Sequence, residues 1–407
     1  MNVLNRGITA NFFRRFSSRP LTFFSNDQET LRSSVRDFAR LEIQPLTAKM
    51  DKEGKMDPNL IRKLFDQGLM GMEVPQEYGG SGLGFTDTCI AVEEISRVDP
   101  AVAVLVDIHN TLLTRALIKF GTEDQKNKYL SKLANEYPGS FAISESSAGS
   151  DAFAIKTKAE KLKDGNFKIS GEKMWISNSQ EAGLFLVFAV TDAKKGNKGI
   201  TAFLVEKSEN VKIGKKEDKL GIRASSTCVV HFDGAITNQI LGKEGEGAAI
   251  AIGLLNEGRI GIAAQMLGLS KGVFEIALRY VREREQFGEK IYNFQGLRFQ
   301  IARARMNIEA AHLLVYNAAA LKESCDRGEI TSKDFIKEAA MAKLFASEVA
   351  ESTASQAIDW MGGVGFTKDY TVEKFYRDAK IGSIYEGTSN IQLETIAKQL
   401  EKENSSL

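Results

Sequence analysis

The sequence predicts an α+β protein that is mainly α, with an N-terminal helical domain, a central antiparallel β-domain and a C-terminal four-helix bundle. Apolar residues recur at helical spacing up to about residue 137, in short alternating runs from about 140 to 241, and again at helical spacing after Gly247. No proline follows Pro138, so nothing interrupts long helices there. At 407 residues the chain exceeds what one hydrophobic core usually organises.

Residues 26–139 are expected to form the helical domain. Leu31, Val35 and Phe38 recur at i, i+4 and i+7 after a polar start signal at residues 25–27 (SND). Prolines at 45, 58, 75 and 100 should divide this region into separate helices. The glycine-rich residues 79–84 (GGSGLG) should form a loop between two of them.

Residues 140–243 are expected to form the β-domain. Short apolar or alternating runs are separated here by Asp-Gly, Lys-Gly and Gly-Asn pairs, which are typical of turns between strands. The runs are residues 167–170, 184–189, 200–205 and 228–232.

Residues 244–407 are expected to form the bundle, because three apolar stripes step by three and four residues along the chain. Small residues in the third stripe would let helices approach closely. The stripes are Val273, Ile276, Ala277, Tyr280 and Val281; Leu297, Ile301, Ala304, Ile308, Ala311 and Val315; and Phe335, Ala339, Ala342, Ala346 and Val349.

The first 25 residues have the composition of a mitochondrial transit peptide. They carry four arginines, several serines and phenylalanines and no acidic residue. Removing this segment would change the formal net charge from +1 to −3, which disfavours nucleic acid as a partner. No apolar run approaches the length of a membrane span, so integral membrane insertion is not expected.

Several common chemistries find no support in the sequence. The three cysteines and three histidines are scattered, without metal-ligand spacing, so no metal site is expected and a catalytic base is not expected to be histidine. The Gly-x-Gly-x-x-Gly and P-loop patterns are both absent, which disfavours a Rossmann dinucleotide site or a P-loop nucleotide site.

Four segments carry candidate functional residues. Glu386 precedes a glycine in residues 383–390 (SIYEGTSN), and a glycine lets backbone pass close to a ligand. Its companions are residues 360–365 (WMGGVG), 141–151 (FAISESSAGSD) and 173–177 (KMWIS). Since these lie in the β-domain and in the bundle, we expect the ligand site in a cleft between units.

These segments resemble the acyl-CoA dehydrogenase family of flavoenzymes, and the resemblance runs from about residue 27 to 399. Residues 148–151 (AGSD), 219–228 (KLGIRASSTC), 255–266 (LNEGRIGIAAQM) and 379–388 (AKIGSIYEGT) are most similar to its short/branched-chain branch. The resemblance implies FAD bound between a helical domain, a β-domain and a four-helix bundle. It also implies a homotetramer.

The chemistry that the resemblance implies is removal of two hydrogens across Cα and Cβ of an acyl-CoA. Glu386 matches the family base, which takes the α-proton while hydride leaves Cβ for the flavin N5. A base buried beside the acyl chain and the flavin should have a raised pKa. The backbone N–H of Glu386 would help to bind the thioester carbonyl oxygen.

The other site residues are carried over from the family position by position. Contacts to FAD are expected from Ser144, Ser150, Trp175, Ile176, Ser177, Arg284, Gln295, Asp359, Trp360, Met361, Gly362, Gly363, Thr388, Ser389 and Asn390. Contacts to the acyl-CoA are expected from Ser150, Asn256, Glu257, Gly258 and Arg259.

Some relatives place the base at the position that aligns with Gly258, which makes the adjacent Glu257 a rival. One helical step turns a side chain by about 100°, so Glu386 is preferred. Asn197 and Ala248 stand where the short/branched-chain branch has aromatic residues, which favours a broader or displaced acyl pocket. Ser146-Ser147 replaces a frequent Pro-Gly and leaves that loop conformation open.

The sequence thus predicts a mitochondrial matrix enzyme that acts on short and 2-methyl-branched acyl-CoA and passes electrons to electron-transfer flavoprotein. The alternatives are a butyryl- or isobutyryl-CoA dehydrogenase, an oxidase, or an assembly factor that keeps the fold without turnover.

Overall fold

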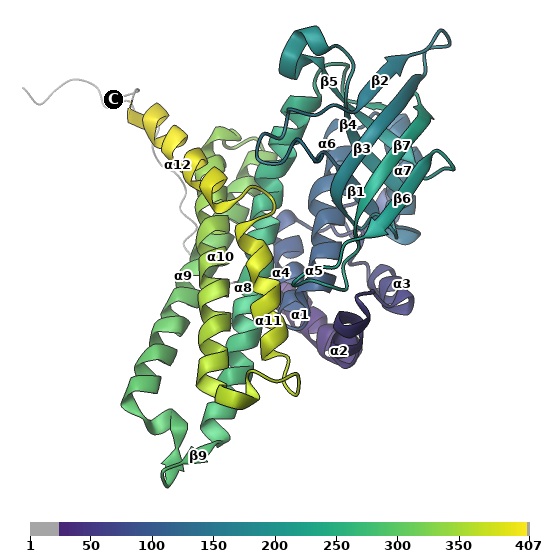
Figure 1. The fold of residues 1–407 in the computed structure, drawn as a ribbon. Helices are drawn as coiled ribbons and strands as arrows, with labels where there is room; N and C mark the ends of the chain where they lie inside the picture. The colour runs from purple at the N-terminus through teal and green to yellow at the C-terminus, as the bar shows by residue number, and fades with distance from the viewer. Residues whose placement is uncertain (1–23, 405–407) are drawn as a thin grey trace, which may run out of the picture.

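The computed structural model describes residues 24–404 (Figure 1). Its N-terminal unit is made of helices, of which α1 and α5 both pack on α4. Ser25 caps the first helix in a reciprocal pair: the Gln28 N–H donates to Ser25 Oγ at 3.2 Å, and the Ser25 N–H donates to Gln28 Oε1 at 3.1 Å. The predicted start signal is confirmed. The helices are α1 (Asn26–Phe38), α2 (Gln44–Glu53), α3 (Pro58–Asp66), α4 (Phe85–Ser96), α5 (Pro100–Asp107), α6 (Arg115–Phe120) and α7 (Glu123–Asn135).

The prolines act as predicted at helix starts. Pro58 and Pro100 are the first residues of α3 and α5, where a missing N–H costs nothing, and Asp57 and Asp99 cap those helices. Residues 79–84 form the expected loop. Two π-helical turns that the sequence did not predict, Ala39–Ile43 and Ile108–Thr114, continue α1 and α5 into the following helices.

The central unit is a sheet, but it is mixed rather than purely antiparallel. Strand β1 pairs in parallel with β4, and β2 also meets β4 in parallel. The prediction was wrong here because β2 and β3 form a crossover between β1 and β4, which sequence periodicity does not reveal. The strands are β1 (Gly139–Ala142), β2 (Lys158–Lys161), β3 (Phe167–Ser177), β4 (Leu184–Val190), β5 (Ile200–Glu206), β6 (Val211–Lys216), β7 (Thr227–Thr237) and β8 (Ile240–Leu241), in the order β6-β7-β3-β2-β4-β5-β8.

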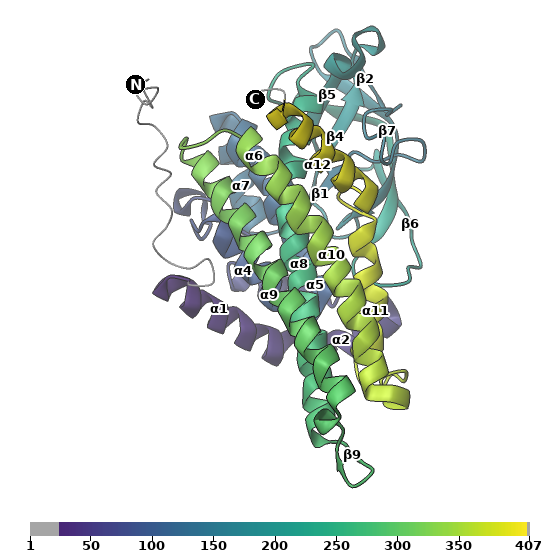
Figure 2. The ribbon, with the colours of Figure 1, turned by 90° about the vertical axis from the view of Figure 1, so that its left-hand side faces the viewer.

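The last unit is the predicted helical bundle (Figure 2). The third stripe is fully buried, and the other two lie mainly in the core. Its long helices are joined by a short hairpin at one end, and two shorter helices packed on α10 take the place of a fourth long helix. The elements are α8 (Gly247–Glu283), β9 (Glu285–Gln286), β10 (Glu289–Lys290), α9 (Gln295–Asp326), α10 (Lys333–Met361), α11 (Val372–Ala379) and α12 (Ser389–Asn404).

Two helical stretches of the described residues are long and apolar enough to cross a membrane, contrary to the sequence expectation that no run reaches that length. They are Pro100–Phe120 and Gly247–Glu283. However, 94% and 89% of their most apolar windows are buried inside the protein. Helices that are apolar on all sides are also found in the core of large proteins, and these two fit that description.

A buried ion triad joins the three units at one point. Lys374 of α11 donates to Asp99 Oδ1 at 3.0 Å and to Asp378 Oδ2 at 2.6 Å. The other oxygen of Asp378 accepts the backbone N–H of Ile222, from the β-domain, at 2.5 Å. Since Asp99 caps α5, the triad links the helical domain, the sheet and the bundle.

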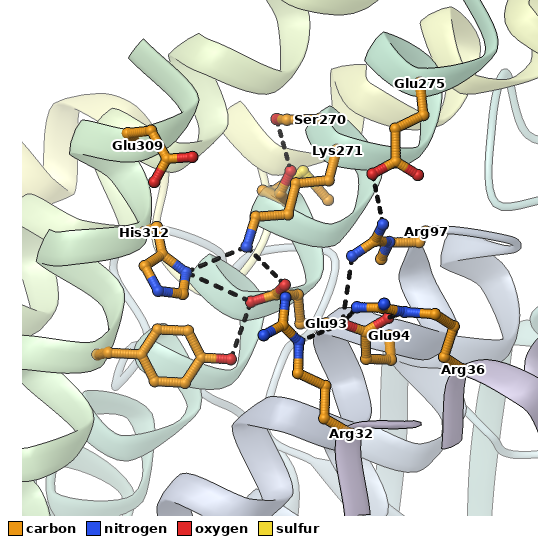
Figure 3. Close-up of polar contacts among 12 residues, drawn as sticks. Arg32, Arg36, Glu93, Glu94, Arg97, Ser270, Lys271, Glu275, Glu309 and His312 are labelled. Carbon is orange, nitrogen blue, oxygen red and sulfur yellow. Dashed lines mark hydrogen bonds and ion pairs between the residues drawn. The ribbon is translucent and has the colours of Figure 1, made fainter. Parts of the chain in front are cut away.

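A second buried network ties α1 and α4 to the bundle (Figure 3). Glu94 accepts from Arg32, Arg36 and Arg97, at 2.8–3.2 Å. Its neighbour Glu93 accepts from Lys271 Nζ at 2.7 Å and from the Tyr316 hydroxyl at 2.8 Å, and it lies 3.8 Å from His312 Nδ1. Buried carboxylates need such partners, so these contacts fix where the N-terminal helices sit on α8 and α9.

Candidate functional site

Glu386 lies in the loop between α11 and α12 and adopts a left-handed backbone, with φ of 51°. A residue with a side chain rarely adopts this conformation, and it persists only where its surroundings hold it. Gly387 follows with φ of 86°, which a glycine adopts without steric cost. The carboxylate-glycine pair singled out in the sequence is therefore a strained turn.

Side chains from two helices hold this turn in place. The amide of Gln392 in α12 donates to the carbonyl oxygens of Glu386 and Gly387, at 3.0 and 2.8 Å. From α10, Lys343 Nζ donates to the carbonyl oxygens of Gly382 and Gly387, at 2.5 and 2.8 Å. The backbone on both sides of Glu386 is thus fixed by hydrogen bonds.

The Glu386 carboxylate packs against α8 at Gly258. A Cβ at position 258 would lie 3.1 Å from Glu386 Oε2 and 3.0 Å from Leu112 Cδ2, so a glycine here leaves room for the carboxylate. Oε2 is buried and accepts no hydrogen bond from the residues that the structure describes, although the residue as a whole is partly exposed. A buried oxygen without a partner is unusual and indicates a proton- or ligand-binding role.

The surroundings of Glu386 shift the pKa of its carboxyl towards neutral pH. Burial raises the pKa of its carboxyl to about 7, and the positive charges of Arg259 and Lys343 oppose that rise. A carboxyl with a pKa near 7 is well suited to accept a proton at neutral pH.

A second carboxyl, Asp107, lies at the end of α5 close enough for its charge to interact with that of Glu386. It is buried against α8, where a Cβ on Gly261 would lie 1.9 Å from Asp107 Oδ1. Burial, followed by the charge of Glu386, raises the pKa of Asp107 well above its ordinary value. The raised pKa favours the neutral form of Asp107, which also accepts from the Thr111 hydroxyl at 3.2 Å.

The rival base Glu257 is placed in a separate ion cluster. Arg115 Nε donates to Glu257 Oε2 at 2.9 Å, and Lys119 Nζ donates to Oε1 at 2.8 Å. These cations and Lys322 lower the pKa of Glu257, although burial alone would raise it. The structure brings Gly258, and not Glu257, to the Glu386 carboxylate.

On the β-domain side, Trp175 stands out among the predicted cofactor contacts. Its side chain is 54% exposed, and its φ is 62° at an irregularity in the pairing of β3 with β7. The next residue, Ile176, is buried opposite Cys228, and Ser177 pairs with Thr227. An exposed indole held by a fixed strand is available to pack on a planar ligand. Nearby, the carbonyl of Ser144 accepts the Met174 N–H at 2.9 Å.

In the bundle, the predicted contacts at 359–363 divide into two groups. Trp360 and Met361 are core residues, 5% and 3% exposed, and Trp360 Nε1 donates to Gln300 Oε1 at 3.0 Å. Asp359, Gly362 and Gly363 are exposed. A Cβ on either glycine would meet nothing within 4 Å, so bare backbone is open to a ligand there.

The other predicted cofactor residues lie at helix ends. Arg284 and Gln295 flank the β9–β10 hairpin, and both are exposed. Thr388 caps α12, and Ser389 and Asn390 are its first residues. Arg284, Gln295 and Asn390 are exposed at these boundaries and can reach a partner, whereas Thr388 Oγ1 already accepts the Ile391 N–H at 3.3 Å.

The predicted substrate residues do not form one cluster among the described contacts. Asn256 is buried and accepts from Arg259 Nη1 at 2.9 Å, while Ser150 lies exposed in a loop.

Ala248 is buried in the first turn of α8, and Asn197 is exposed in the 3₁₀ segment Ala193–Gly199. A smaller residue at 248 is therefore a change inside the fold, whereas Asn197 lies on the surface.

The loop at Ser146 and Ser147, whose conformation the sequence left open, is a tight turn. The N–H of Glu145 donates to the Ala148 carbonyl at 3.1 Å, and the reverse bond is 3.0 Å long. Both serines are exposed between these two bonds. Serine is compatible with such a turn without the expected Pro-Gly.

The histidines have structural partners. His109 is buried between the Met70 carbonyl and the Gly139 N–H, and burial lowers its pKa to about 4. His231 lies on the sheet surface beside Glu172. Among residues 24–404, no group of three or more His, Cys, Asp or Glu side chains could hold a metal ion.

Two surface cavities lie away from Glu386. One of about 440 Å³ is on the sheet around Lys212 and His231, and one of about 300 Å³ lies beside Arg115 and Cys325. Neither is lined by Glu386 or by the predicted cofactor residues. The cleft between units that the sequence suggests stays a prediction.

Asp107, Lys343 and Gln392 belong to this site but were not predicted from the sequence. A usable signal exists for the first two. Asp107 interrupts the apolar run at 101–108, and Lys343 stands one turn after Ala339 on the buried stripe of α10. A charged residue on an otherwise apolar helix face needs a partner or a function.

Comparisons with known proteins agree with this architecture. Family models described as the N-terminal, middle and C-terminal domains of acyl-CoA dehydrogenase match residues 25–137, 140–235 and 245–401. The short/branched chain specific acyl-CoA dehydrogenase, mitochondrial, of Rattus norvegicus is 52% identical over 388 residues, which cover 94% of this chain and 88% of that protein.

Two solved structures have the same fold. One, described as the electron transferring flavoprotein of Acidaminococcus fermentans, has a TM-score of 0.89 and 40% identity and covers 93% of this chain and 99% of its own. The other, an acyl-CoA dehydrogenase complexed with FAD from Bacillus anthracis, has a TM-score of 0.87 and 30% identity, with coverages of 94% and 68%.

Proposed function

The chain belongs to the acyl-CoA dehydrogenase family, and from this premise we propose that it removes two hydrogens across Cα and Cβ of short and 2-methyl-branched acyl-CoA thioesters. It is an FAD-dependent oxidoreductase. The substrate class rests on the 52% identity to a short/branched-chain enzyme. The single observation that carries the mechanism is the buried, unpaired carboxylate oxygen of Glu386.

In this proposal Glu386 accepts the α-proton. Its pKa of about 7 leaves a substantial ionised fraction at neutral pH, and burial makes the anion a stronger base than an exposed carboxylate. No hydrogen bond from the Glu386 N–H to another described residue is present, so this N–H is available for the thioester carbonyl oxygen. Binding the carbonyl there would stabilise the negative charge that develops as the proton leaves.

The residues present fit FAD. The exposed indole of Trp175 and the open backbone at Gly362 and Gly363 provide a stacking surface and close approach. Ser144, Ser177 and the polar start of α12 would supply hydrogen bonds, and Arg284 with Gln295 would bind its outer part. When bound, FAD supplies the acceptor for the hydride that leaves Cβ.

The function is tested by an acyl-CoA panel with purified, FAD-loaded protein. We expect the highest kcat/KM with 2-methylbutyryl-CoA or another short substrate, and turnover with electron-transfer flavoprotein rather than oxygen. The small residue Ala248 predicts that longer or bulkier acyl groups are also accepted, and Ala248→Phe should narrow that range. Preference for oxygen as acceptor, or no turnover with any acyl-CoA, would contradict the proposal.

Turnover should depend on pH through Glu386. Because its pKa is raised to about 7, the base is protonated and inactive below that pH, and kcat/KM should rise as pH increases through about 7. Arg259, Lys343, Asp107 and Tyr385 are the other titratable groups that interact with it. A pH profile with a non-sticky substrate measures this rise, and a flat profile between pH 5 and 8 would argue against Glu386 as the base.

The location and assembly are proposed as mitochondrial matrix and homotetramer, following the mitochondrial relative and the family resemblance. Most of the expected 1–25 transit segment lies outside the described residues. Phe24, however, packs on Tyr316 and His312 with ring centroids 4.8 and 6.0 Å apart, and Ser25 caps α1. Cleavage should therefore fall before Phe24. N-terminal sequencing of the mature protein checks this, and a chain that starts after Ser25 would contradict it.

A further inference from the structure

Lys343 is unlike the other buried lysines of the protein. Lys173, Lys271, Lys322 and Lys374 each have a carboxylate at 2.6–2.8 Å. Lys343 is 0% exposed, yet its Nζ donates to backbone carbonyls, and no carboxylate among residues 24–404 lies within ion-pair distance of it. A buried ammonium without a close counter-charge is costly, and burial lowers the pKa of Lys343 to about 8.

The hydrogen bonds of Lys343 go to the loop that carries Glu386. Nζ donates to the carbonyls of Gly382 and Gly387, which lie on either side of the base. Ser347 Oγ, one turn further along α10, also donates to the Gly382 carbonyl at 2.9 Å. Lys343 therefore spans the loop at the point where Glu386 adopts its strained backbone.

The carboxylate whose charge raises the pKa of Lys343 most is that of Glu386. The interaction is mutual, because the positive charge of Lys343 opposes the rise in the pKa of Glu386. From α8, Arg259 supplies a second positive charge. Burial raises the pKa values of Asp107 on α5 and of Tyr385 in the loop, which favours their neutral forms. Lys343 and Arg259 are thus the cations that face the base.

We propose that Lys343 is a positioning residue of the reaction: it holds the Glu386 loop through two backbone carbonyls and supplies a positive charge to the ionised base. This role rests on the proposed function of Glu386. It explains why a buried lysine is kept without a carboxylate of its own, since its counter-charge is the catalytic carboxylate, which is ionised before it takes the α-proton and neutral afterwards. The Lys343 side chain thus acts in two ways: its hydrogen bonds hold the loop, and its charge stabilises the Glu386 carboxylate.

Gln392 provides a matched control, because it donates to the same Gly387 carbonyl but carries no charge. Lys343→Met, Lys343→Gln and Gln392→Met are prepared as FAD-loaded proteins, with Glu386→Gln as reference. The pKa of Glu386 is read from the infrared carbonyl band of its protonated form, which the reference lacks. We expect Lys343→Met and Lys343→Gln to raise that pKa by about one unit, so that the ionised fraction at pH 7 falls roughly fivefold. Gln392→Met should leave it near the wild-type value.

The pH dependence of kcat separates the effect of the Lys343 charge from the effect of its hydrogen bonds to the loop. For Lys343→Gln the deficit in kcat should shrink as pH rises, because the base ionises again, whereas for Gln392→Met it should persist at every pH. The proposal is overturned if both Lys343 variants keep the wild-type pKa of Glu386. It is also overturned if both Lys343 variants fail to bind FAD while Gln392→Met binds it, because Lys343 would then be needed for the fold rather than for the base. If Glu386→Gln itself retains wild-type turnover, the proposed function fails, which is a distinct result.

Discussion

Replacing Glu386 by glutamine is expected to slow flavin reduction by acyl-CoA about 10²- to 10⁴-fold, the usual contribution of a general base. Glutamine has nearly the same shape, so the loop, its bonds to Gln392 and the packing on Gly258 should persist. FAD content and acyl-CoA binding should therefore stay close to wild type. Stopped-flow reduction under anaerobic conditions measures the loss.

Glu257→Gln is the matched control for the rival base. Glu257 is bound to Arg115 and Lys119 rather than facing Gly258, so its replacement should change flavin reduction only a few-fold. The free energy of unfolding should fall instead, because Arg115 loses a buried partner. A large loss of reduction in Glu257→Gln together with a small loss in Glu386→Gln would reverse the assignment.

Lys374→Met is expected to give the largest loss of stability, about 3–5 kcal/mol. Lys374 is 3% exposed between Asp99 and Asp378, and although burial opposes it, these carboxylates raise the pKa of the lysine above its ordinary value. Without the ammonium, two acids are left buried together where all three units meet. The shift of the urea midpoint at constant excess FAD measures the effect.

Two variants serve as controls for this prediction. Lys380→Met removes a surface ion pair with Glu351 at 3.0 Å and should cost less than about 1 kcal/mol. Adding Asp99→Asn and Asp378→Asn to Lys374→Met should restore part of the stability, because asparagine still caps α5 and still accepts the Ile222 N–H. No restoration would mean that lost packing, rather than buried charge, causes the effect.

The helical units were predictable because their signals are local. The stripe from Phe335 to Val349 has a period that only a buried helix face satisfies, and Pro58 and Pro100 start helices as their chemistry requires. Strand runs were also located from apolar alternation. The pairing of the strands could not be predicted, because the parallel contact of β1 with β4 joins residues more than 40 positions apart.

Only part of the candidate site could be predicted, because some of its residues come together only through contacts between distant parts of the chain. Glu386 was found through its neighbours in sequence and through the family resemblance, and its strained φ agrees with a functional turn. Lys343 and Asp107 reach it from α10 and α5, so only the packing of distant helices reveals them. Trp360 lies in the core because the helical period of α10 turns it inward, and its predicted contact with the cofactor stays a prediction.

We propose that this chain oxidises a short or 2-methyl-branched acyl-CoA through a base at Glu386. The most direct test mixes the FAD-loaded protein anaerobically with 2-methylbutyryl-CoA and follows the flavin absorbance, with Glu386→Gln in parallel. We expect rapid bleaching with formation of the 2-enoyl-CoA in the wild type and almost none in the variant. Equal bleaching in both proteins, or none in the wild type with any short acyl-CoA, would contradict it.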